Sequence, residues 1–155
     1  MTHRVRTAVQ RDAATVGQLL YDFNTEFDAV TPTARVLGTR FDRLLASADV
    51  VVILAEDGSG EAIGFAFLTL RPTPYYDGPV AQLEELYVRP TLRDGGIGTA
   101  LLGGAISLVR ARGAGEMQIN VDEVDVDTRR FCERHGFVNT EPGSDYRMLC
   151  YIRDL

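Results

Sequence analysis

The pattern of apolar residues along this chain separates predicted helices from predicted strands. Spacings of three and four residues predict helices over residues 16–27, 37–45, 96–112 and 128–135. Runs rich in β-branched and aromatic residues predict strands over residues 4–9, 50–55, 62–70, 80–88, 117–121 and 146–152. Asp12 is a candidate cap for the first helix, and Pro32 ends it. The order predicts one mixed α/β domain over residues 1–155.

Glycine is concentrated in one part of the chain, because seven of the 15 glycines lie between Gly95 and Gly115. The densest run, residues 93–99, joins a predicted strand to a predicted helix. Glycine lets the backbone turn its N–H groups towards a ligand, and the N-terminus of a helix favours anions. The run therefore indicates either a pyrophosphate site or a closely packed helix start.

Two common phosphate-binding patterns do not fit this run. The dinucleotide pattern G-x-G-x-x-G fails because Leu101 occupies the third glycine position. The P-loop fails because the chain contains no lysine, and all 16 of its basic residues are arginine. The absence of lysine also excludes pyridoxal enzymes, Schiff-base aldolases and protein kinases.

Two motifs remain. Leu83 to Pro90 is followed by Arg93-x-x-Gly96-x-Gly98, and residues 128–137 end in Gly-Phe. Together and in this order they resemble the two central motifs of the GNAT superfamily of N-acetyltransferases, whose signature is Arg/Gln-x-x-Gly-x-Gly/Ala. The resemblance covers nearly the whole chain. It implies a mixed, mostly antiparallel sheet flanked by helices, the GNAT-like α/β fold.

The resemblance also implies acetyl-coenzyme A as the acetyl donor. Backbone groups of Leu86, Tyr87 and Val88 are then expected along the pantetheine arm. The pyrophosphate is expected in the glycine loop, at Arg93, Asp94, Gly95, Gly96, Ile97, Gly98 and Thr99. Residues 89–112 carry four arginines against one aspartate, inside a chain of net charge −6, and this local excess suits a polyphosphate donor.

Amide formation needs a neutral acceptor amine, so a base must remove a proton from the alkylammonium. Glu84 and Glu85 are adjacent on a predicted strand, and the resemblance implies that a carboxylate here acts as the base, often through water. Successive strand residues point to opposite faces, so only one of the two faces the acceptor unless a bulge turns the strand. The family commonly has such a bulge; between the two, we favour Glu84.

The coenzyme A thiolate needs a proton when it leaves, and the family usually supplies it from a tyrosine. Here that position is Cys132, which departs from the family pattern. A thiol is acidic enough to donate, but we favour Cys132 as a small buried apolar residue. Water and the hydroxyls of Tyr75, Tyr76 and Tyr87 are the alternatives. Asp125 replaces an asparagine that is common in the family.

The resemblance places the acceptor between the first two helices and the loop after the third strand. The candidate residues there are Phe23, Glu26, Phe27, Tyr75 and Tyr76. Acidic and aromatic side chains suit a small cationic amine, such as a polyamine, an aminoglycoside or an amino-acid-like amine. The acidic positions are equally typical of the wet face of an amphipathic helix.

These observations predict an N-acetyltransferase that moves the acetyl group of acetyl-coenzyme A to a primary amine by direct transfer in a ternary complex. The alternatives are a sensor that binds acetyl-coenzyme A without efficient turnover, a protein or peptide N-acetyltransferase, and an unrelated phosphate-binding domain. The two cysteines and two histidines lack metal-ligand spacing, so no metal is expected.

The remaining expectations concern location and partners. Net negative charge argues against nucleic acid as a partner, and no apolar run reaches the roughly 18 residues of a membrane span. A cytoplasmic enzyme is therefore expected. The predicted end strand over residues 146–152 allows a homodimer.

Overall fold

The computed structural model describes residues 2–155, which fall into two compact units that meet between Met117 and Gln118. The first unit contains β1 (His3–Thr7), η1 (Gln10–Asp12), α1 (Ala13–Glu26), α2 (Ala34–Leu45), β2 (Val50–Asp57), β3 (Ala62–Arg71), β4 (Val80–Val88), η2 (Pro90–Leu92) and α3 (Ile97–Ala111). β5 (Glu116–Ile119) crosses the boundary, and α4 (Val126–Arg134) lies in the second unit. A single domain over the whole chain stays a prediction.

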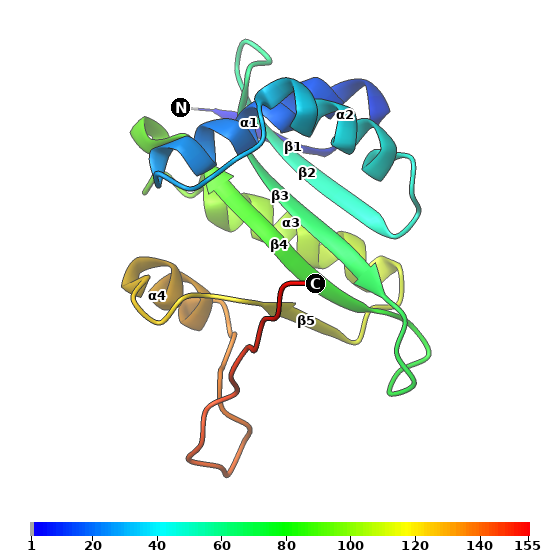
Figure 1. The fold of residues 1–155 in the computed structure, drawn as a ribbon, viewed down its shortest axis with the longest axis vertical. Helices are drawn as coiled ribbons and strands as arrows, with labels where there is room; N and C mark the ends of the chain where they lie inside the picture. Colours follow the sequence, from blue (N-terminus) through cyan, green and yellow to red (C-terminus); the bar gives the residue numbers. More distant parts are fainter. Residues whose placement is uncertain (1) are drawn as a thin grey trace. The chain divides into compact units, whose positions relative to one another are not determined.

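The strands follow chain order in the sheet, β1-β2-β3-β4-β5. The pairs β1/β2, β2/β3 and β3/β4 are all antiparallel. Helices α1 and α2 cover one face of these strands, and α3 covers the other (Figure 1). The predicted mixed, mostly antiparallel sheet flanked by helices is therefore confirmed.

The core on the α1/α2 face is formed by residues from both helices and from β2, β3 and β4, including Leu19, Phe41 and Phe65. The two helix backbones approach closely because glycine lies at the crossing. A Cβ built on Gly17 would lie 2.4 Å from the amide nitrogen of Gly38. A larger residue at this crossing would force α1 away from α2, and α1 carries two of the candidate acceptor residues, Phe23 and Glu26.

Most predicted elements are present, with boundaries within a few residues of those expected. Asp12 does not cap α1 with its side chain; it accepts from the amide of Val9 and pairs with Arg6 instead. Residues 146–152 were predicted as a strand, and this prediction is wrong, because the segment has no regular secondary structure. Its aromatic and apolar composition satisfies strand propensity, but a strand also needs a paired neighbour.

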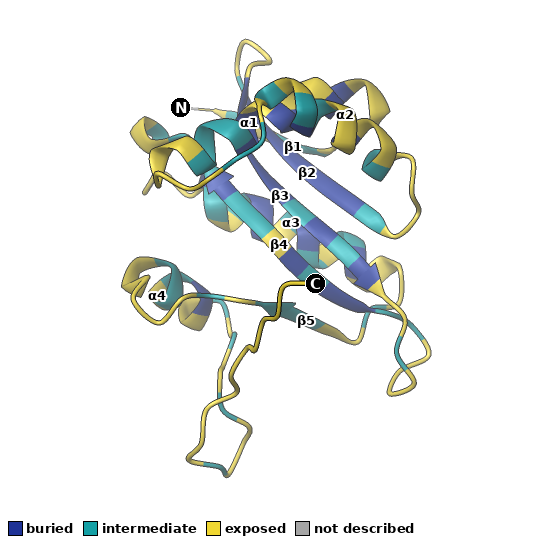
Figure 2. Ribbon diagram, in the orientation of Figure 1, coloured by how far each residue is buried: buried dark blue, intermediate teal, exposed yellow. Residues whose placement is uncertain are grey.

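In the second unit, α4 begins with a capped turn and ends at a glycine. The Asp125 carboxylate accepts from the amide of Thr128, and Gly136 has φ of +87°. His135 Nδ1 lies 2.8 Å from the carbonyl oxygen of Phe131 at the helix end, which indicates a structural role there. The segment after α4 is mostly exposed, as the yellow C-terminal trace in Figure 2 shows. In the described range 2–155, no helix is long and apolar enough to cross a membrane.

Candidate active site

The two adjacent glutamates lie at a bulge in β4. The register against β3 pairs Phe67 with Glu85 and Leu68 with Leu83, which leaves Glu84 as an extra residue without a cross-strand partner. A bulge of this kind shifts the alternation of side chains along the strand by one position. Leu83 therefore lies on the α3 face, whereas Glu85 lies on the α1/α2 face.

Both carboxylates are on the same face of the sheet. Glu85 lies opposite Phe67, whose ring packs edge-on against Phe41 of α2 at 5.3 Å between centroids. The hydroxyl of Thr69, which shares a face with Phe67, donates to Glu84 Oε1 at 2.5 Å. Without the bulge, one carboxylate would point into the apolar packing beneath α3.

The two carboxyl groups differ in environment. Glu84 is exposed and bonded to Thr69, whereas Glu85 is half-buried, and no hydrogen bond to its carboxyl group is found within residues 2–155. Burial, and secondarily the negative charge of Glu84, raise the pKa of Glu85 from 4.5 to about 7. A carboxyl group with such a pKa can exchange a proton near neutral pH, as a general base must.

The glycine loop after β4 ends at the N-terminus of α3. Asp94 and Gly96 have φ of +62° and +84°, a left-handed conformation that turns the chain sharply into the helix. The first backbone bond at this end runs from the amide of Ala100 to the carbonyl of Gly96, 3.0 Å away. The amides of Ile97 and Gly98 precede this bond and have no acceptor within the helix. The loop thus fits a polyphosphate group.

The peptide groups of β4 alternate between its two edges. The amide of Arg89 donates to the carbonyl of Ile63 in β3 at 2.9 Å. Antiparallel pairing then directs the N–H and C=O groups of Tyr87 towards β3. The N–H and C=O groups of Leu86 and Val88 point towards the opposite edge of β4. Leu86 and Val88 are therefore the two predicted pantetheine residues with backbone groups facing away from β3.

The arginines of the basic region, residues 89–112, are less available to bind an anion than the composition of the region predicts. Arg93 forms two hydrogen bonds of 2.7 Å to the carboxylate of Glu26, one from each terminal nitrogen. Arg89 lies 3.4 Å from the carboxylate of Asp22. Two of the four arginines in this region are therefore paired with acidic residues of α1, and the backbone amides are the main candidates for binding an anion in the loop.

The predicted acceptor residues form two separate groups. Phe23 packs on Tyr87 at 5.1 Å and edge-on against Phe27 at 5.3 Å, beyond the C-terminal half of β4. Tyr75 and Tyr76 precede β4, whose nine residues make eight steps of about 3.3 Å and so separate the two groups by roughly 26 Å. Glu84 and Glu85 lie between the two groups.

Several predicted roles are limited by contacts within the protein. Both carboxylate oxygens of Glu26 are bonded to Arg93, so Glu26 is not free for an acceptor cation. The Tyr76 hydroxyl donates to Glu116, which raises the pKa of Tyr76. Burial raises the pKa of Tyr87. These two tyrosines are therefore weaker acids than a free tyrosine.

Cys132 lies in α4 of the second unit and is buried. Burial is the main cause that raises the pKa of its thiol, and Asp125 and Glu133 raise it further. A thiol with a raised pKa gives up its proton less readily.

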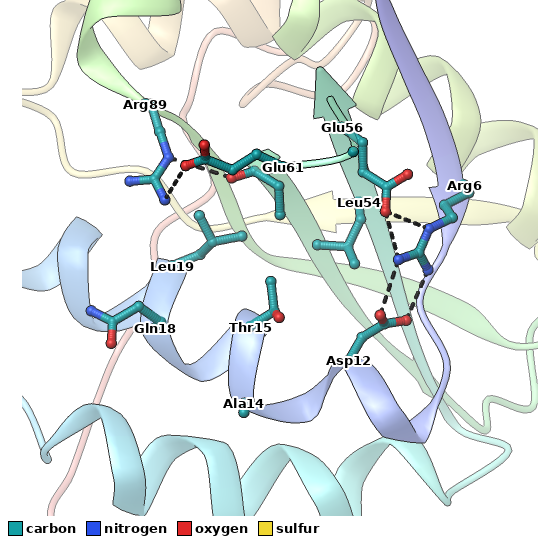
Figure 3. Close-up of a pocket in the computed structure, with 12 residues that line it drawn as sticks. Arg6, Asp12, Ala14, Thr15, Gln18, Leu19, Leu54, Glu56, Glu61 and Arg89 are labelled. Carbon is teal, nitrogen blue, oxygen red and sulfur yellow. Dashed lines mark hydrogen bonds and ion pairs between the residues drawn. The ribbon is translucent and has the colours of Figure 1, made fainter. Parts of the chain in front are cut away.

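A cavity of about 550 Å³ lies elsewhere, and neither Glu84, Glu85 nor the glycine loop lines it (Figure 3). It lies beside the first half of α1 and the β2–β3 turn, and charged side chains line it. Arg6 pairs there with Asp12 and Glu56 at 2.8 and 2.6 Å, and Arg89 lies 3.7 Å from Glu61. The pairs of Arg6 connect β1 to β2 and to η1, just before α1, which indicates a structural role for these charges.

Comparison with known proteins identifies the fold that holds these features. Residues 16–137 match the Acetyltransferase (GNAT) family. The chain belongs to the GNAT family of acetyltransferases. As a GNAT protein it is an acetyl-coenzyme A-dependent N-acetyltransferase, so the resemblance inferred from its two motifs is confirmed.

Individual relatives of this GNAT enzyme agree with that assignment. It is 32% identical over 148 residues to an aminoglycoside N(6')-acetyltransferase type 1 of Stenotrophomonas maltophilia, covering 93% of this chain and 92% of the relative. A crystal structure of a protein from Arthrobacter sp. FB24, proposed to be an acetyltransferase, has 51% identity and a TM-score of 0.90, covering 98% and 96% of the two chains. AAC(6')-Iy in complex with a coenzyme A bisubstrate analogue shares the fold at 20% identity and a TM-score of 0.75, covering 97% and 100%.

One contact of this GNAT site was not anticipated from the sequence. Thr69, which holds Glu84, was treated only as part of an apolar strand. A lone hydroxyl in the run 62–70 was the available signal, and its partner became visible only with the register of β3 against β4. In the described part of the chain, no group of three metal-ligating side chains is present.

Proposed function

We propose that this enzyme acetylates a primary amine of a small, cationic acceptor of the aminoglycoside type, by direct transfer within a ternary complex. The observation that carries the proposal is the bulge in β4, which brings Glu84 and Glu85 together on one face. A pair of carboxylates favours a cationic acceptor, and the half-buried member has the pKa of a base that works near neutral pH.

Glu85 is the proposed base, in place of the preference for Glu84 from sequence alone. Glu85 takes a proton from the acceptor ammonium, directly or through one water molecule. The neutral amine then attacks the thioester carbonyl carbon, a C–N bond forms, and the C–S bond breaks to release the coenzyme A thiolate. As the tetrahedral intermediate collapses, the second amine proton passes to water, and water delivers a proton to the thiolate.

Donor binding is assigned to the edge of β4 that faces away from β3 and to the glycine loop. The backbone groups of Leu86 and Val88 pair with the pantetheine amides as an added strand would. The amides of residues 95–99, following Asp94, hold the pyrophosphate at the helix N-terminus. The backbone groups of Tyr87 pair with β3, so Tyr87 contributes only its ring to the wall of the site.

We assign protonation of the thiolate to water. The raised pKa values of Cys132 and Tyr87 make both side chains poorer donors than the tyrosine usual in the family. Cys132 is then a packing residue of α4.

Acceptor recognition is assigned to charge and to aromatic surface. Glu84, held by Thr69, attracts a second ammonium group of the acceptor, and Phe23 and Phe27 offer ring surface near Tyr87. The relative from Stenotrophomonas maltophilia, named for aminoglycoside N(6')-acetylation, supports this acceptor class.

An amine panel tests the proposed acceptor. Aminoglycosides, polyamines, amino acids and peptides with free N-termini are each mixed with acetyl-coenzyme A, and thiol release is followed with mass spectrometry of the products. We expect acetylation of aminoglycosides or polyamines, at kcat/KM well above that for peptides. Preference for peptides would overturn the acceptor class, and donor binding without release for any amine would favour a sensor.

We further propose that the enzyme works in the cytoplasm as a homodimer. Residues 146–152 support the dimer, because Leu149, Tyr151 and Ile152 are 64%, 89% and 87% exposed in a mostly apolar segment. A second copy would cover these side chains. Sedimentation should give a dimer for the native chain and a monomer for Ile152→Arg with cooperative unfolding retained. A native chain that stays monomeric at all concentrations contradicts the dimer.

A further inference from the structure

Arg93 contacts three different parts of the site at once. Its two terminal nitrogens bind the carboxylate of Glu26 at 2.7 Å, and its Nε donates to the carbonyl of Val88 at 3.0 Å. The guanidinium also lies over the ring of Tyr87, 5.8 Å from its centroid. A planar fork that binds a carboxylate bidentately and stacks on an aromatic ring is a contact that lysine cannot reproduce.

These contacts join the last turn of α1 to the beginning of the glycine loop. Glu26 is the last residue of α1, and Phe23, one turn earlier, packs on the same Tyr87 ring. A second ion pair, between Asp22 and Arg89, also joins α1 to a residue that follows β4. The end of α1 is therefore fixed to the segment that leads from β4 into the donor loop.

We propose that Arg93 is a positioning residue that couples the donor loop to α1, and not a ligand of the donor diphosphate. The bidentate pair with Glu26 neutralises the positive charge of Arg93, which would otherwise attract a diphosphate. The same pair holds Phe23 against Tyr87, with Phe27 edge-on against Phe23. Donor binding and the arrangement of the acceptor helix are thus linked through one ion pair. The inference rests on the proposed use of the glycine loop for acetyl-coenzyme A.

The variant Glu26→Gln separates the two roles of Arg93, because they predict different changes in the Kd of acetyl-coenzyme A. If Arg93 couples the two parts, loss of the carboxylate loosens the loop, and the Kd of acetyl-coenzyme A rises about two- to fivefold, the range of a partly exposed ion pair. If Arg93 is a diphosphate ligand, removing its competitor leaves the Kd unchanged or lowers it. Calorimetry at one fixed salt concentration measures this constant without turnover.

Three further variants complete the design. Arg93→Lys keeps the charge but loses the fork, so we expect it to weaken donor binding as much as Glu26→Gln; a diphosphate ligand would tolerate lysine. In the Arg93→Gln background, Glu26→Gln should add little, because the two residues act through one contact. Asp42→Asn is the control, since it removes one exposed carboxylate of α2 that is bonded to Gln10 and to neither Arg89 nor Arg93, and its donor Kd should equal that of the native chain.

Hydrogen exchange supplies a readout that does not depend on activity. Binding of acetyl-coenzyme A should slow exchange at amides 22–27 in the native chain, and Glu26→Gln should abolish this slowing. Faster exchange in Glu26→Gln with an unchanged donor Kd would reduce the pair to a structural contact and overturn the coupling. Failure of the native chain to bind acetyl-coenzyme A would instead contradict the proposed donor site.

Discussion

Glu85→Gln should lower kcat about 10²- to 10⁴-fold, the range that general base catalysis contributes, and leave the KM for acetyl-coenzyme A nearly unchanged. Glutamine has almost the same size as glutamate but cannot take a proton. The acceptor ammonium would then lose its proton only to solvent. Steady-state kinetics with an acceptor found in the amine panel measures both constants.

Glu84→Gln is the matched control, since it removes the same charge one residue away. We expect a higher KM for the acceptor and a kcat within about tenfold of the native value, because the base remains. A larger loss in kcat for Glu84→Gln than for Glu85→Gln would assign the base to Glu84 and reject our assignment.

Glu85→Gln should also change how stability depends on pH. The fold raises the pKa of Glu85 from 4.5 to about 7. The native state therefore holds this proton more tightly than the unfolded state, and that stability is lost as pH rises from 4.5 through 7. Glutamine avoids the loss, so the variant should be more stable than the native chain at pH 8, by about 2–3 kcal/mol, and show a smaller gain at pH 5. Denaturant unfolding at the two pH values checks the sign.

Gly96→Ala should raise the KM for acetyl-coenzyme A by about tenfold, since a left-handed residue other than glycine costs roughly 1–2 kcal/mol. Gly96 has φ of +84°, and a Cβ there would meet no atom within 4 Å. The effect therefore comes from backbone conformation and not from a clash. A relaxed loop would turn the amides of residues 96–98 away from the pyrophosphate.

Gly103→Ala is the control for this variant, because Gly103 lies in the middle of α3 and a Cβ there also meets nothing within 4 Å. Alanine at a helical position stabilises by about 0.5–1 kcal/mol, so this variant should unfold later and keep the native donor KM. Equal donor affinity in Gly96→Ala and the native chain would show that the conformation of Gly96 is not needed for binding.

Local patterns predicted most of the fold. The spacing of Leu19, Leu20 and Phe23 defines α1, and the β-branched run at 50–55 defines β2, because these elements bury the faces that the patterns describe. The pattern at 146–152 predicted a strand that is absent. Local propensity for a strand does not reveal whether a neighbouring edge is available to pair with it.

The site depended more on long-range contacts. The motif around Glu84 and Glu85 located the candidate base, but the bulge that turns both to one face depends on the register against β3. The pairing of Glu26 with Arg93, 67 residues away, has no sequence signal, so Glu26 was assigned to the acceptor. Charge counts likewise could not reveal that Arg89 and Arg93 are paired with α1.

Carbon-13 NMR titration of the Glu85 carboxyl group, assigned by its disappearance in Glu85→Gln, tests the central claim most directly. The measurement uses the native chain without acceptor, so ionisation of the amine does not contribute. We predict a midpoint near 7 that falls in Glu84→Gln, because the negative charge that helps to raise it is gone. A midpoint near 4.5, or one that Glu84→Gln leaves unchanged, would contradict a base held on the acceptor face beside a second carboxylate.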